Sequence, residues 1–157
     1  EEKGLLGSQY YTSNPLVPLE NIIADINIDM IGRTDAAHED NANYIYVIGS
    51  DRLSMDLHKA NECVNENHIG LDLDYTFNDD NDPNRFYYRS DHYNFAKNNI
   101  PVIFYFSGVH KDYHQPGDTV DKIMFERAAK VARLAFLTSL ELLNAEQRPQ
   151  LNGTDVE

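Results

Sequence analysis

Five consecutive apolar residues, Val102 to Phe106, form the segment that most restricts how this chain can fold. The preceding residues Asn98, Asn99 and Pro101 end the segment before it. A short run of β-branched and aromatic residues that is apolar at every position is typical of a strand covered on both faces of a sheet. We therefore predict that Val102 to Phe106 is the central strand of an α/β domain.

The rest of the chain alternates between strand and helix patterns. Apolar and polar residues alternate from Ile22 to Met30 and from Leu71 to Phe77, and the polar face of the second segment predicts an edge strand. Tyr44 to Ile48 also has strand composition. Helical spacing of apolar residues extends from Leu53 to Asn67 and from Asp121 to about Glu146. Shorter helices are expected over residues 4–12 and after Ser90, which is the candidate N-cap.

Composition limits the possible functions. The chain has 157 residues, about one domain, and 41% of them are hydrophobic, which is enough to build a core. Its net charge of −13 repels phosphate backbones and anionic membranes, so nucleic-acid binding is disfavoured. No apolar stretch reaches the roughly 18 residues that span a membrane. The single cysteine, Cys63, forms no internal disulfide and is expected to be a buried thiol on its helix, so His, Asp and Glu would hold any metal.

Three segments are candidates for chemistry, because ligands of open α/β sheets bind beyond the carboxyl ends of the strands. They are Glu1-Glu2, Asp29 at the end of a strand, and the loop from His110 to His114. Carboxylates and imidazoles are ligands that zinc accepts at roughly 2.0 to 2.2 Å. Taken one at a time, each has an ordinary explanation: a solvated chain end, a strand-end Asp bonded to a turn, and a hydrogen-bonded loop histidine.

The combination of these segments is more specific. EEKGLLGS, INIDMIGR, SDHYNFAKNNIPVIFYF and DYHQPGDT, followed by a long helix, together resemble the co-catalytic dizinc aminopeptidases and carboxypeptidases of metallopeptidase family 28. The resemblance covers nearly the whole chain. It implies a three-layer α/β/α fold with a mixed, mostly parallel central sheet. Residues 1–149 are then the C-terminal part of a zinc exopeptidase catalytic domain, and residues 150–157 a flexible tail.

The resemblance also implies a role for each matching residue. Glu1 would be the general base that takes a proton from the attacking water, while Glu2 would be a zinc ligand. Asp29 would bind the second zinc, and His114 the same zinc as Glu2. Tyr113 would donate its hydroxyl to the oxyanion of the tetrahedral intermediate.

The family's upstream ligands are missing from this sequence. A His for the second zinc and an Asp that bridges both metals would precede Glu1, and the chain begins with Glu rather than Met. We therefore expect the chain to be part of a longer protein that binds two zinc ions, and to be inactive by itself with partial or no metal. Asp118 is expected to orient a loop that carries a ligand.

The function favoured by the resemblance is hydrolysis of terminal peptide bonds of a peptide substrate. An aminopeptidase is the favoured exopeptidase, although these residues do not distinguish it from a carboxypeptidase. A periplasmic or secreted protein is expected. Two alternatives stay open: a glutaminyl-cyclase-like acyltransferase with one zinc, and a non-catalytic module on a peptidase-like fold. Ser90, Asp91 and His92 are adjacent at a helix start and cannot converge as a serine triad. The acidic residues 78–82 lack the pattern of an EF-hand calcium loop.

Overall fold

The computed structural model describes residues 3–153, in which four strands form one mixed sheet. The strands are β1 (Asp25–Asp29), β2 (Tyr44–Ile48), β3 (Asp72–Asp74) and β4 (Val102–Phe106), in the order β1-β4-β2-β3. β1 is parallel to β4 and β3 is parallel to β2, whereas β2 and β4 are antiparallel. The central position of β4, the edge position of β3 and a mixed, mostly parallel sheet are therefore confirmed.

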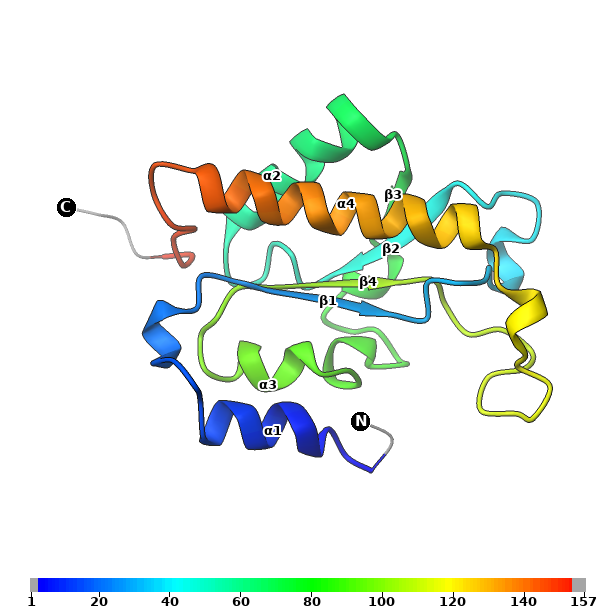
Figure 1. Ribbon diagram of the computed structural model, residues 1–157, viewed down its shortest axis with the longest axis horizontal. Helices are drawn as coiled ribbons and strands as arrows, with labels where there is room; N and C mark the ends of the chain where they lie inside the picture. Colours follow the sequence, from blue (N-terminus) through cyan, green and yellow to red (C-terminus); the bar gives the residue numbers. More distant parts are fainter. Residues whose placement is uncertain (1–2, 154–157) are drawn as a thin grey trace.

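Helices cover both faces of this sheet, as Figure 1 shows. The two longer ones, α2 (Met55–Val64) and α4 (Phe125–Asn144), pack side by side on one face. The shorter α1 (Leu6–Ser13) and α3 (His92–Ala96) lie on the other. The predicted three-layer α/β/α architecture is confirmed.

The alternation of side chains in the central strands explains why their sequences are apolar throughout. In β4, Ile103 and Tyr105 face α2 and α4, while Phe104 and its alternate neighbours face the α3 side. β2 divides its residues in the same way, so all ten residues of β2 and β4 are buried. Each face of the sheet therefore has its own core cluster beneath its own helices.

Several predicted boundaries were too wide. The structure confines the first strand to Asp25–Asp29, and the segment after β3 turns into a short 3₁₀-helix, Thr76–Asn78. α2 begins after Ser54, whose hydroxyl accepts a hydrogen bond from the backbone N–H of Leu57. The expectation of a buried Cys63 was wrong, because its side chain is exposed. The buried face of α2 is formed by other residues, namely Leu57, Asn61 and Val64.

The end of the described chain folds back on the start of α2. The side-chain oxygen of Asn152 accepts from the backbone N–H of Met55 at 2.9 Å, and its amide group donates to the carbonyl of Asp51 at 2.7 Å. Gln150 and Asn152 are thus hydrogen-bonded to the domain, while residues 154–157 of the proposed tail lie outside the described residues. Within residues 3–153, none of the helices has the length and apolar character needed to cross a membrane.

Candidate active site

The candidate site lies where β1 and β4 end. The two strands are parallel with Asp29 opposite Phe106, so the chain leaves both strands at the same edge of the sheet. Asp29 is the last residue of β1, and the segment after β4 carries Tyr113 and His114. The fold therefore brings together two of the three candidate segments, which are about 80 residues apart in sequence.

Asp29 is half-buried and is oriented by a serine that the sequence did not single out for this purpose. The Ser90 hydroxyl donates to Oδ2 of Asp29 at 2.9 Å and accepts from the side-chain amide of Asn27 at 2.9 Å. Ser90 is itself buried, at 3% exposure. The expectation that Ser90 caps the following helix was therefore wrong: its hydroxyl is committed to β1, and α3 has no side-chain cap.

Tyr113 shares a small pocket with Asp29, and the remaining walls of this pocket are mostly apolar. Tyr113 also stacks on His114, with ring centroids 3.8 Å apart. His114 is exposed and has a left-handed backbone, with φ of 54°. The other residues that line the pocket are Met30, Phe86, Arg89, Phe104 and Phe106.

Charged residues tie the loop that carries Tyr113 and His114 to the segment after β1. One guanidinium nitrogen of Arg33 donates to Asp112 at 2.8 Å and to Asp118 at 3.1 Å. The Lys122 ammonium donates to the same carboxylate oxygen of Asp112 at 2.9 Å. These hydrogen bonds from Lys122 and Arg33 lower the pKa of Asp112 to about 2. Asp118 thus contacts Arg33, and a role for it in orienting a ligand loop stays a prediction.

Zinc fits the types of donor in this region, but the described residues do not complete a site. Asp29 supplies a carboxylate and His114 an imidazole, which are the ligand types that zinc accepts. Among residues 3–153, no group of three His, Cys, Asp or Glu is placed to hold a metal. Glu1 and Glu2 lie outside the described residues, so their roles, and the gathering of Glu2 with Asp29 and His114, stay predictions.

The segment around Ser90 forms no serine triad. Ser90 bonds Asp29 and Asn27, whereas the Asp91 carboxylate accepts from the hydroxyl of Ser8 at 2.5 Å. His92 is fully buried and stacks on Phe104 at 4.7 Å, and this burial lowers its pKa to about 4. The Asn27 amide lies near both the Ser90 hydroxyl and His92 Nδ1, at 2.9 and 3.5 Å, but the Asp91 carboxylate is turned to Ser8. The three side chains therefore do not form the Ser-His-Asp relay that activates a nucleophile.

Sequence reasoning missed Asp25, the first residue of β1. One of its carboxylate oxygens, Oδ2, is buried and has no hydrogen-bond partner among the described residues. Burial, and secondarily the nearby charge of Asp91, raises the pKa of Asp25 to about 7. The only signal in the sequence was its place in the polar half of a period-2 pattern, which does not say whether that face is covered.

Comparison with solved structures identifies proteins of the same fold. The aminopeptidase from Aneurinibacillus sp. strain AM-1 aligns over 99% of this chain with a TM-score of 0.66 and 22% identity. The Legionella pneumophila aminopeptidase LapA aligns over 93% with a TM-score of 0.69 and 21% identity. The Bacillus subtilis zinc aminopeptidase BSAP aligns over 98% with a TM-score of 0.66 and 23% identity. No curated protein matches the chain.

These similarities concern a part of each relative. The chain covers 33%, 38% and 36% of those three solved chains, or little more than a third of their length. At 21–23% identity they show the fold. The family follows from the sequence itself, because the model of peptidase family M28 matches residues 1–139, most of the chain. The chain therefore belongs to peptidase family M28.

Proposed function

We propose that this chain is part of a zinc-dependent exopeptidase, and specifically of an aminopeptidase, that hydrolyses terminal bonds of peptides. The observation that carries the proposal is the shared pocket of Asp29 and Tyr113 at the carboxyl ends of β1 and β4. Membership of peptidase family M28 supports peptide hydrolysis. The fold similarity to proteins described as aminopeptidases, one of them a zinc aminopeptidase, favours this specificity and this metal.

Asp29, His114 and Glu2 are the proposed zinc ligands of this chain. Zinc supplies Lewis acidity, which polarises a carbonyl and makes water a nucleophile near neutral pH. The Ser90 hydroxyl holds one oxygen of Asp29 and so fixes the direction of the carboxylate. The side chains that line the pocket beside Asp29 include four apolar ones, those of Met30, Phe86, Phe104 and Phe106.

Proton transfer and oxyanion binding are assigned to two further residues. Glu1 would accept a proton from the attacking water and pass it to the leaving amine. The Tyr113 hydroxyl would donate a hydrogen bond to the oxygen that becomes negatively charged. The described residues supply two of the proposed metal ligands, so we expect the complete site to need Glu2 and the upstream His and bridging Asp that the sequence resemblance implies.

The test uses the full-length protein that contains this chain. We expect about two zinc ions per chain and release of an N-terminal residue from a chromogenic amide. Glu1→Gln should abolish turnover while zinc content stays unchanged, because the amide cannot accept the proton. Glu39→Gln, at an exposed glutamate far along the sequence, is the matched control and should retain turnover.

Other outcomes contradict the proposal in different ways. One zinc per chain with cyclisation of an N-terminal glutamine would identify a cyclase instead. Full-length protein with neither metal nor turnover would identify a binding module. Retained turnover in Glu1→Gln would remove Glu1 from its proposed role.

A further inference from the structure

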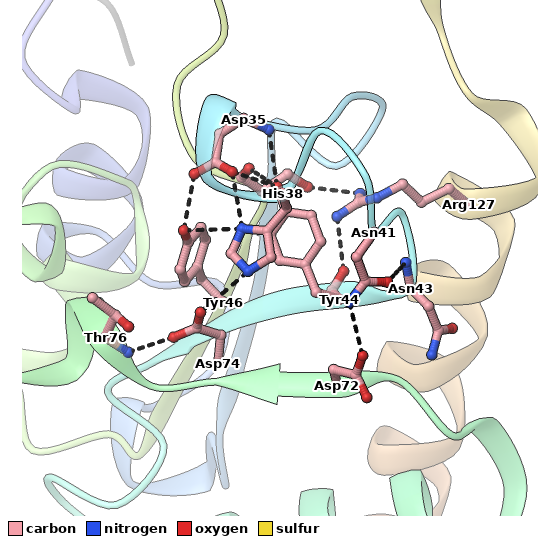
Figure 2. Close-up of polar contacts among 11 residues, drawn as sticks. Asp35, His38, Asn41, Asn43, Tyr44, Tyr46, Asp72, Asp74, Thr76 and Arg127 are labelled. Atoms are coloured by element: carbon pink, nitrogen blue, oxygen red, sulfur yellow. Dashed lines mark hydrogen bonds and ion pairs between the residues drawn. The ribbon is translucent and has the colours of Figure 1, made fainter.

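Arg127 is a buried cation in the first turn of α4, and its position calls for an explanation. It is 6% exposed. Its guanidinium donates to the carbonyl of Ile31 at 2.6 Å, the hydroxyl oxygen of Ser107 at 2.8 Å and the carbonyl of Tyr44 at 2.8 Å. Figure 2 shows the guanidinium beside Tyr44. Burying a charge is costly unless it is hydrogen-bonded, and here two of the three guanidinium nitrogens are bonded.

The three acceptors lie at the ends of three strands. The last pair of the β1–β4 ladder is Asp29 with Phe106, so Ile31 and Ser107 are the residues just beyond it. Tyr44 begins the antiparallel strand β2 at the same edge. Arg127 therefore connects Ile31, which follows β1, to Ser107, the first residue of the segment that carries Tyr113 and His114. Both residues lie beyond the last backbone pair of the β1–β4 ladder.

A second set of contacts holds Ser107 through residues of β2 and the loop before it. The Tyr44 hydroxyl donates to the carbonyl of Ser107 at 2.5 Å, and the Asp35 carboxylate accepts from Tyr46 at 2.9 Å. His38 lies between two carboxylates, 3.0 Å from Asp35 and 3.4 Å from Asp74 (Figure 2). The imidazole of His38 also stacks on Tyr44, with ring centroids 3.6 Å apart. Ser107 is thus fixed through both its hydroxyl and its carbonyl.

A helix that needed only to cover the sheet would be served by an apolar residue at position 127, because replacing a buried charge by a well-packed hydrophobic side chain is often neutral or stabilising. The guanidinium instead reaches past the core to backbone and hydroxyl acceptors on two site segments. We propose that Arg127 is a positioning residue that sets the segment bearing Tyr113 and His114 against Asp29, an inference that rests on the proposed function for its catalytic meaning.

The experiment compares Arg127→Met with Arg148→Met in the full-length protein. Arg148 is a matched control, because it also donates to two backbone carbonyls, those of Glu20 and Ile22, but it lies at the opposite end of β1. Amide hydrogen exchange of residues 107–118 and the dissociation constant for zinc alone are measured, the latter by competition with a chromophoric chelator. Arg127→Met should accelerate exchange in this segment and weaken zinc binding about 10- to 100-fold, as loss of supporting contacts around metal ligands does. Arg148→Met should do neither.

Two milder variants keep the test decisive if Arg127→Met fails to fold. Ser107→Ala removes one acceptor of Arg127, and Tyr44→Phe removes the hydroxyl that holds the Ser107 carbonyl. Both should accelerate exchange in residues 107–118. Exchange and zinc affinity that stay at wild-type values in folded variants would overturn the inference. Wild-type protein that binds no zinc would refute the proposed function, while the exchange measurement would still report on the positioning role.

Discussion

Asp25 provides a direct test of how this domain tolerates a buried charge. Its carboxylate lies on β1 with one oxygen unbonded, and its pKa is raised from 3.8 to about 7, mainly by burial and secondarily by Asp91. The native state therefore holds this proton more tightly than the unfolded state. The contribution of Asp25 to stability is most favourable below pH 3.8, becomes less favourable as the pH rises, and reaches its full penalty above pH 7.

The size of the effect follows from the shift. Three pH units at about 1.4 kcal/mol each correspond to a penalty of about 4 kcal/mol in the free energy of unfolding above pH 7. Asp25→Asn, which is neutral at every pH, should therefore raise the free energy of unfolding by up to this amount at pH 8 and by close to nothing at pH 4. Exposed Asp40 offers the control Asp40→Asn, which should show no such pH-dependent gain.

Two measurements check this reasoning. Urea unfolding of both variants at pH 4 and pH 8 gives the difference in stability, and the ¹³C shift of the Asp25 carboxyl gives its titration midpoint directly. A midpoint below pH 5, or an equal gain at both pH values, would show that the unpaired carboxylate is not held protonated by its surroundings.

Two further substitutions test the candidate site and its support. Ser90→Ala should weaken zinc binding by the full-length protein about 10-fold, because Asp29 loses its orienting donor. The control is Ser50→Ala, at a buried serine that contacts His58 at 2.9 Å, and it should leave the zinc dissociation constant unchanged. Gly108→Ala should destabilise the protein by about 1 to 3 kcal/mol in thermal unfolding, because Gly108 has φ of +82° and a Cβ there would overlap the Asp35 carboxylate. The φ of Gly70 is also positive but nothing lies near its Cβ, so Gly70→Ala should cost less.

The sequence predicted the layers of the fold because its strongest signals are local. A continuous apolar run identified β4 as central, and helical spacing identified α2 and α4. The predicted ends of strands were less accurate where the alternation of apolar and polar residues continues beyond the backbone pairing with the neighbouring strand. The alternation from Ile22 to Met30 continues on both sides of β1, but pairing with β4 covers only Asp25–Asp29. Alternation reports which side chains share a face, whereas strand ends depend on the partner strand.

The candidate site was predictable to the extent that its residues are recognised by chemical type and position. Asp29 ends a strand, and the loop from His110 to His114 follows one, so both segments could be selected by position. The role of Tyr113 within that loop came from the family resemblance. Ser90 and Arg127 were not selected for their observed contacts, since each acts through a partner more than 60 residues away. A serine before a short helix is typical of a cap, and an arginine in an amphipathic helix is typical of a solvated face.

The polar face of β1 shows why the contacts of the site could not be predicted from the sequence pattern alone. Asp25, Asn27 and Asp29 alternate with apolar residues, the pattern of a strand with one wet face. In the structure that face is covered by the segment around α3, which brings Ser90 to Asn27 and Asp29 but leaves one oxygen of Asp25 without a partner. The same face of β1 therefore contains the carboxylate of Asp29, which Ser90 orients, and the carboxylate of Asp25, one oxygen of which has no hydrogen-bond partner among the described residues. Their different environments, rather than their identical chemistry, make Asp29 the candidate ligand and Asp25 the group that holds a proton near neutral pH.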